Sequence, residues 1–282
     1  MDPNLMTPHT PDVLIKWFAR TDVGKVRKNN EDSFLGLQFD AQGVERLGKY
    51  GEGHTCQKDF VFAVSDGMGG AMAGEYASRI AVDKVTTLLP RAFKHRALGL
   101  ESGFNDLLGE LFDQIHRAIV YVGNSYDECR GMETTLSLCW FTPSWMFFGH
   151  IGDSRIYHLC GSSLTLKQLT QDDTHVGWLL RNGMIQPWEA RTHPRRNVLQ
   201  KALGGGNQFV DPQVGAIHFE PGDSFLLCTD GLTEGLYEHH LVDHLRPQTS
   251  PNDDVNPANQ LVEQALANDG RDNTTALVVQ IR

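Results

Sequence analysis

The 282-residue sequence is poor in cysteine and has no long apolar run. Its five cysteines are odd in number, and none has the CxxC spacing of a zinc or redox site, so we expect reduced thiols rather than disulfides. No run approaches the ~20 apolar residues that span a bilayer. Residues 1–12 hold three prolines and lack a signal-like apolar core, so we expect a disordered lead. These features predict a cytoplasmic protein without a membrane partner.

An excess of basic residues is also missing. The chain has 25 Lys and Arg against 35 Asp and Glu, a formal net charge of −10, and this balance does not favour nucleic acid as a partner. A hydrophobic content of 40% and a charged content of 21% are ordinary for a globular protein. Because β-rich domains of ~200–250 residues are common, we expect residues 13–282 to form a single domain.

The hydrophobic pattern predicts strands, then two helices, then strands again. Two amphipathic helices are expected from Gly74 to Pro90, where the proline ends the helix, and from Phe104 to Val122. A third helix is expected at 258–267, and the glycine-bearing segment 40–58 is interpreted as a hairpin connection. Strands are expected at 13–20, from Asp32 onward, and at 60–66, 134–141, 145–151, 155–159, 224–228 and 274–281. This order predicts an α+β fold in which antiparallel sheet packs against helical layers.

One stretch, Phe60 to Gly70, contains an apolar strand that ends abruptly at Asp66 in a glycine-rich turn. Such an aspartate is often only a turn former. Here, however, five aspartates occupy the same position between an apolar strand and a turn. They are Asp32, Asp66, Asp153, Asp230 and Asp272.

Converging carboxylates repel one another and need a cation to neutralise them. All-oxygen ligands select hard ions, so Mg²⁺ or Mn²⁺ fits such a site and zinc does not. Two such ions ~3.5–4 Å apart would activate water for in-line displacement at phosphorus. Arg27 offers a planar, permanently charged fork suited to phosphate, although it could also be a solvated surface arginine.

Eight short motifs follow one another along the chain: 26–32 (VRKNNED), 66–70 (DGMGG), 74–75 (GE), 134–135 (TT), 149–155 (GHIGDSR), 169–172 (LTQD), 229–232 (TDGL) and 271–275 (RDNTT). This ordered series resembles the PP2C (PPM) family of metal-dependent serine/threonine protein phosphatases, and the compact length and DGMGG variant resemble its bacterial branch. The resemblance runs from about residue 20 to the C-terminus.

The resemblance implies a central sandwich of two antiparallel β-sheets flanked by helices, with a metal centre at one end. By position, Asp66 would bridge two metal ions and the Gly67 carbonyl would bind one of them. Asp32, Asp230 and Asp272 would complete the dinuclear site, partly through water. Loss of Asp66 or Asp230 is therefore expected to abolish turnover.

Further roles follow from the same resemblance. Asp153, together with Asp230, would hold a weaker third metal ion, and Glu31 would lie beside the site. Arg27 would hold the substrate phosphate. The irregular segment 170–203, with a short helix at 175–182, resembles a mobile flap beside the substrate cleft.

The sequence departs from the family where a proton donor for the leaving group is expected. Met68 and Ala71 stand where eukaryotic and many bacterial members, respectively, have histidines, and the flap motif has Asp173 in place of histidine. His175 or His193 could reach the cleft from the flap, or a water on the metal could serve.

The expected function is hydrolysis of phosphoserine and phosphothreonine by metal-activated water, without a covalent phosphoenzyme. The partners would be phosphorylated proteins, including a Ser/Thr kinase and its targets. Two alternatives stay open: a catalytically inactive pseudophosphatase that binds phosphoproteins, and a metal-dependent hydrolase of small phosphate esters or nucleic acid. The net charge of −10 suits long polyanions poorly.

Overall fold

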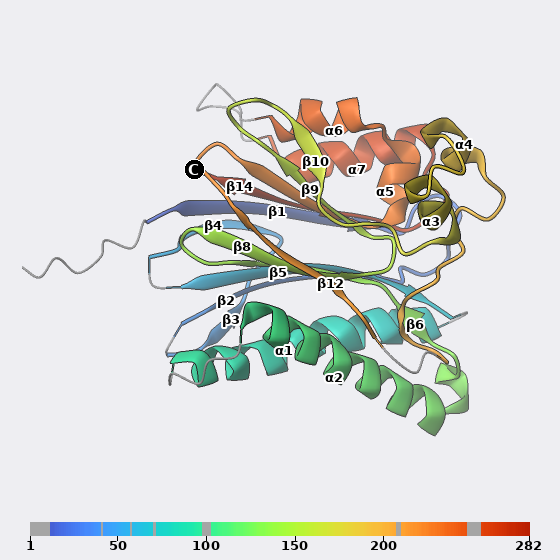
Figure 1. Cartoon of the computed structure of the whole chain (residues 1–282), viewed down its shortest axis with the longest axis horizontal. Helices are drawn as coiled ribbons and strands as arrows, with labels where there is room; N and C mark the ends of the chain where they lie inside the picture. The colour runs from blue at the N-terminus through green and yellow to red at the C-terminus, as the bar shows by residue number, and fades with distance from the viewer. Residues whose placement is uncertain are drawn as a thin grey trace, which may run out of the picture.

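The computed structural model describes residues 12–40, 42–56, 58–69, 72–97, 103–206, 210–246 and 255–282. Two antiparallel sheets stack face to face, and helices cover the outer face of each sheet (Figure 1). The predicted sandwich of two sheets between helical layers is therefore confirmed. The expected disordered lead falls almost entirely outside the described residues.

The first sheet has six strands in the order β10-β9-β13-β14-β1-β4. Helices α6 and α7 lie over it (Figure 1). These elements are β1 (Leu14–Asp22), β4 (Tyr50–His54), β9 (Arg155–Leu159), β10 (Leu166–Gln168), β13 (Ser224–Cys228), β14 (Thr274–Ile281), α6 (Glu238–Leu245) and α7 (Pro257–Asn268).

The second sheet has eight strands, with the path β11-β6-β5-β7-β8-β12 and with β2 paired to both β5 and β3. Helices α1 and α2 lie over its outer face (Figure 1). These elements are β2 (Asp32–Phe39), β3 (Val44–Arg46), β5 (Asp59–Met68), β6 (Glu133–Thr134), β7 (Leu136–Phe141), β8 (Trp145–Ile151), β11 (Leu203–Gly204), β12 (Gln213–His218), α1 (Ala73–Ala97) and α2 (Phe104–Ser125).

Three short helices lie together at one end of the sandwich (Figure 1). They are α3 (His175–Arg181), α4 (Pro187–Thr192) and α5 (Asp230–Gly235). A 3₁₀ turn, η1 (Asp127–Cys129), follows α2. In the part of the chain that the structure describes, no helix is both long and apolar enough to cross a bilayer.

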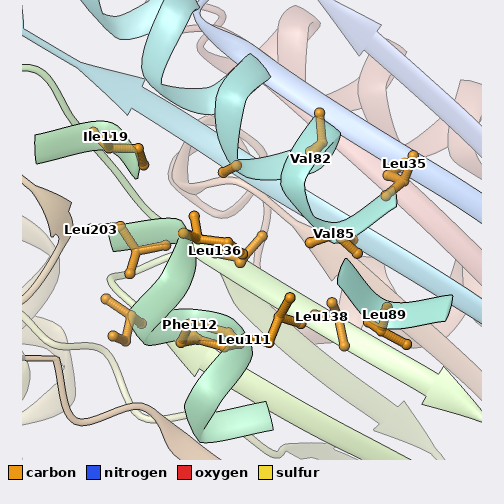
Figure 2. Packing of buried hydrophobic residues seen from close by; sticks show 14 of the residues in the cluster. Leu35, Val82, Val85, Leu89, Leu111, Phe112, Ile119, Leu136, Leu138 and Leu203 are labelled. Atoms are coloured by element: carbon orange, nitrogen blue, oxygen red, sulfur yellow. The ribbon is translucent and has the colours of Figure 1, made fainter. Parts of the chain in front are cut away.

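Strand β5 is buried on both faces, which fixes the position of its acidic end. Phe60 and Phe62 point between the sheets, where their ring centroids lie 6.0 and 5.9 Å from that of Trp17. Val61 and Ala63 belong to the opposite cluster, under α1 and α2. Figure 2 shows this second cluster, in which leucines and valines of both helices meet side chains of β2 and β7. Successive side chains enter alternate packed layers, so a slip by one residue would move each of them into the layer shaped for its neighbour.

Three sequence expectations about the elements are wrong. Helix α1 runs through Pro90 to Ala97, since a proline removes one helix hydrogen bond without necessarily ending a long packed helix. Segment 40–58 is not one hairpin, because β3 pairs with β2 whereas β4 pairs with β1 in the other sheet. Asp230 does not lie in a turn but begins α5.

Candidate active site

Two of the predicted aspartates lie opposite each other on neighbouring strands. The register of β2 and β5 pairs Asp32 with Asp66. The backbone of Asp66 is held on its other side, where its amide donates to Thr135 Oγ1 at 2.9 Å and its carbonyl accepts from Thr134 Oγ1 at 2.8 Å. The two carboxylates therefore face the same end of the sandwich from fixed backbone positions.

The Asp32 carboxylate is only half satisfied. Its Oδ2 accepts hydrogen bonds from Thr229 Oγ1 at 2.8 Å and Thr275 Oγ1 at 2.6 Å. Its Oδ1 is buried and has no hydrogen-bond partner among the described residues. Burial raises the pKa of Asp32 to about 7, although the two threonine hydroxyls act in the opposite direction.

The Asp230 carboxylate also has a buried oxygen, Oδ1, without a hydrogen-bond partner among the described residues. The residue follows the buried strand β13. Burial raises the pKa of Asp230 well above its usual range, and the charges of Asp153 and Asp272 raise it further. The pKa of Asp66 is raised in the same way, by burial first and then by Asp32, Asp230 and other carboxylates. The carboxylates thus lie close enough to repel one another.

Asp272 is paired with the predicted phosphate ligand. Arg27 Nη2 lies 2.7 Å from Asp272 Oδ2, and the Arg27 side chain is 51% exposed. The neighbouring Asn273 connects the loop before β14 to the loop between β1 and β2, since its Nδ2 donates to Val23 O and Asn29 O at 2.9 Å. Arg27 therefore stands beside the carboxylates with part of its guanidinium open to solvent.

The glycine after Asp66 is required by a close backbone approach. A Cβ added to Gly67 would lie 1.9 Å from Gly74 O, at the start of α1. The Gly67 amide donates to Glu31 O at 3.1 Å. The start of α1 is thus packed directly onto this turn, and no side chain can stand between them.

Asp153 lies in a turn that is coupled to the flap. Gly152 has a φ of +110° and exchanges hydrogen bonds with Asp173, whose amide donates to Gly152 O at 2.7 Å and whose Oδ2 accepts from Gly152 N at 3.2 Å. Arg155 binds Asp172 side-on, through Nε at 2.9 Å and Nη2 at 2.6 Å. Burial first, and the charge of Asp172 second, raise the pKa of Asp153 to about 7.

A cavity of about 320 Å³ gathers most of these groups. Six of the seven predicted site residues line it: Arg27, Asp66, Gly67, Asp153, Asp230 and Asp272. Asp32 does not line it and instead borders a separate cavity with residues of α1. Asn197 and Leu199 of the flap also line the first cavity, and sequence reasoning missed both because the 170–203 segment has no periodicity that would mark them.

The histidines proposed as proton donors do not line this cavity. His175 and His193 lie near each other, with ring centroids 6.3 Å apart, but neither is among its lining residues. Met68 does line it. Gly70 and Ala71 lie outside the described residues.

The donor set suits a hard cation that keeps part of its water shell. Within the described residues, no three acidic, histidine or cysteine side chains gather closely enough to hold a metal ion by themselves. Mg²⁺, however, is ordinarily bound by one or two carboxylates plus water. Two buried carboxylate oxygens without partners, among carboxylates that repel one another, provide such a setting.

Known proteins are similar to this chain in sequence and in fold. Residues 51–267 match the family model for protein phosphatase 2C. The serine/threonine phosphatase stp of Listeria welshimeri is 34% identical over 263 residues, which are 93% of this chain and 94% of stp. The serine/threonine protein phosphatase PstP of Mycobacterium tuberculosis is 33% identical over 278 residues, 95% of this chain but only 45% of PstP.

A solved structure extends the comparison to metal. The crystal structure of the catalytic domain of PstP in complex with two manganese ions has a TM-score of 0.72 and 30% identity to this chain. The similarity covers 95% of this chain and 99% of that domain. The matched family model covers well over half of the sequence, and the chain belongs to the protein phosphatase 2C family.

Proposed function

We propose that this chain is a protein serine/threonine phosphatase that hydrolyses phosphoserine and phosphothreonine with the help of bound divalent cations. The observation that carries this proposal is the cavity itself. Five carboxylates line it, Glu31, Asp66, Asp153, Asp230 and Asp272, and Arg27 adds a permanently charged phosphate ligand.

Two Mn²⁺ or Mg²⁺ ions would be held mainly by Asp66, the Gly67 carbonyl, Asp230 and Asp272. Asp32, behind Asp66, would complete the site through water. When bound, such ions activate a water nucleophile and neutralise phosphoryl charge. The two manganese ions in the PstP domain support the proposed number and kind of cations.

A third, weaker cation would lie between Asp153 and Asp230. The charge of Asp153 is the largest contribution from a neighbouring group to the raised pKa of Asp230, so the two carboxylates are close. A cation between them would relieve this repulsion.

Arg27 would orient the substrate. Its Nη2 donates to Asp272, and the other N–H groups of the guanidinium remain to donate to phosphate oxygens. Binding there would hold the phosphorus atom over the carboxylates and align it for attack by water.

The proton for the leaving serine or threonine oxygen would come from solvent. Met68 has no proton to give, and neither His175 nor His193 lines the cavity. The lack of a histidine among the described residues that line the cavity favours one alternative, a pseudophosphatase that binds phosphoproteins without cleaving them. The full set of carboxylates argues against it.

The substrates would be phosphorylated proteins, and we propose that they include a Ser/Thr kinase and its targets. We also propose that the protein works in the cytoplasm, where its five free cysteines would stay reduced. Residues 13–282 would act as one domain in which segment 170–203 is a flap that opens over the cleft.

The test is turnover by the purified protein with Mn²⁺, measured on an aryl phosphate and on a phosphothreonine peptide. Hydrolysis of both is expected. Calorimetry of Mn²⁺ binding should accompany the assay. Metal binding without hydrolysis of either substrate would support the pseudophosphatase, and hydrolysis of the aryl phosphate alone would indicate an enzyme for small esters.

A further inference from the structure

A second cavity, of about 300 Å³, lies beside the carboxylate cavity and carries basic groups. The two cavities share Asp153, Asn197 and Asp230 as lining residues, so they lie next to each other. Its other walls come from α3, α4, α5 and the segment after α4. Four arginines line it, in a chain whose net charge is −10: Arg155, Arg191, Arg196 and Arg271.

Two of these arginines donate from both Nη groups to the fold. Arg155 binds Asp172 side-on and donates from Nη1 to Tyr157 Oη at 2.9 Å. Arg191 donates to the Thr233 and Leu236 carbonyls at the end of α5, at 3.0 and 3.3 Å. Its guanidinium also lies 4.2 Å from the centre of the Tyr237 ring. Through these two side chains, segment 170–203 is bound to β9 and to the end of α5.

The other two arginines keep open donors. Arg196 donates only from Nε, to Glu234 Oε1 at 3.3 Å, and its side chain is 35% exposed. Arg271 binds Asp269 through Nε and Nη2 and is 65% exposed. Within the part of the chain that the structure describes, both Nη groups of Arg196 and Nη1 of Arg271 have no hydrogen-bond partner. They line the cavity as unsatisfied cationic donors.

The charge of the cavity depends on the neighbouring site. Four carboxylates offset its four arginines: Asp153, Asp172, Asp230 and Glu234. Two of these, Asp153 and Asp230, would be neutralised by cations under the proposed function. The remaining wall then has more positive than negative charge and attracts an anion.

We propose that this cavity is a specificity subsite for an anionic side chain, a carboxylate or a second phosphate, that neighbours the phosphoserine or phosphothreonine in the substrate. Arg196 and Arg271 bind that group, while Arg27 binds the scissile phosphate. The inference rests on the proposed function and adds a substrate class to it. The preferred substrates are acidic or multiply phosphorylated segments, and basic flanking residues are disfavoured by like charge.

The test compares peptides that share one phosphothreonine and differ only at flanking positions, which carry alanine, glutamate, phosphoserine or lysine. The glutamate and phosphoserine peptides should have a kcat/KM about fivefold to tenfold above the alanine peptide, mainly through KM. The lysine peptide should fall below it. The glutamate and phosphoserine arms tell which anion the subsite prefers. High salt should shrink these differences, because the groups are partly exposed.

Two variants locate the effect. Arg196→Ala and Arg271→Ala should each remove most of the preference for acidic peptides and leave aryl phosphate hydrolysis unchanged. Arg195→Ala is the matched control, since this exposed arginine adjoins Arg196 but lines neither cavity. Arg196→Lys should keep part of the preference for acidic peptides, because it keeps the positive charge. If Arg196 had only a structural role, the lysine variant would lose the preference as the alanine variant does.

Affinity provides a readout that does not need turnover. Peptides with a non-hydrolysable phosphonate in place of the phosphate should bind the Mn²⁺-loaded protein with the same order of preference. Equal affinity and equal kcat/KM for all flanking residues would overturn the subsite and leave the phosphatase proposal intact. Preferential binding of acidic peptides without any turnover would support the subsite and overturn the phosphatase.

Discussion

Asp32 and Asp66 stand directly opposite each other on β2 and β5, and burial raises the pKa of both carboxyl groups. Asp32 raises the pKa of Asp66 further. The fold therefore holds together groups that destabilise it when they ionise. Such an arrangement is costly in the metal-free protein and becomes favourable when a cation is bound.

This cost predicts a pH-dependent stability. The pKa of Asp32 is about 7 in the folded protein against an ordinary value of 3.8, and that of Asp153 is also about 7. Groups with a raised folded pKa stabilise the protein below the unfolded pKa, and this stability is lost as pH rises through the folded pKa. The Tm of the protein in EDTA should therefore fall by roughly 10 °C between pH 5 and pH 7.5. This fall corresponds to a loss of several kcal/mol in the free energy of unfolding.

Cation binding should also depend on the ionisation of these buried carboxylates. Mg²⁺ should raise the Tm more at pH 7.5 than at pH 5, because the carboxylates bind it when they are ionised. Asp32→Asn should flatten the pH dependence measured in EDTA. An equal Mg²⁺ effect at both pH values would contradict the assignment of these carboxylates to the metal site.

Asp66→Asn should abolish turnover without unfolding the protein. The amide keeps the shape of the side chain but removes the charge that would bridge two cations, and kcat should fall by at least ~10²–10³-fold. Steady-state kinetics with Mn²⁺ and a thermal melt in EDTA measure the two effects separately. Asp113→Asn, on the exposed face of α2, is the control and should leave both unchanged. Near-normal turnover in Asp66→Asn would refute its role.

Arg27→Lys should weaken phosphate recognition although the charge is kept. A lysine cannot make the two parallel hydrogen bonds of a guanidinium fork, so the KM for a phosphopeptide should rise about tenfold. Competitive inhibition by inorganic phosphate should weaken by the same factor. Lys28→Arg, at the neighbouring exposed position, serves as the control. An unchanged inhibition constant would show that Arg27 is only a surface arginine.

Gly67→Ala should damage the site through the backbone. The new Cβ would lie 1.9 Å from Gly74 O, so α1 or the turn after Asp66 must move. Overpacking of this kind costs about 1–3 kcal/mol, and the Tm and the Mn²⁺ affinity should both fall. Gly109→Ala is the matched control, because its Cβ would meet nothing within 4 Å in α2 and should stabilise the helix slightly. Wild-type Mn²⁺ affinity in Gly67→Ala would contradict the role of this turn.

Local chemistry in the sequence determined the family, the two-sheet architecture and most of the candidate site. The expected aspartates lie at or near strand ends, where Asp66, Asp153 and Asp230 follow an apolar run and Asp32 and Asp272 precede one. Six of the seven expected residues line one cavity. The local sequence could not show whether α1 ends at Pro90, because this depends on the packing of the helix and not on the proline alone. The hairpin predicted for segment 40–58 was wrong because β4 of this segment pairs with β1, which is not its neighbour in sequence.

Tertiary structure alone decided which charged groups share a wall. It placed Asp32 behind Asp66 rather than in the cavity, brought Asn197 and Leu199 into it from the flap, and kept His175 and His193 out of its lining. It also gathered Arg196 and Arg271 beside Asp230, although Arg271 lies 75 positions after Arg196 in the sequence. The physical reason is the same in each case: a short-range pattern fixes burial, whereas convergence depends on how the sheets stack and where the flap is anchored.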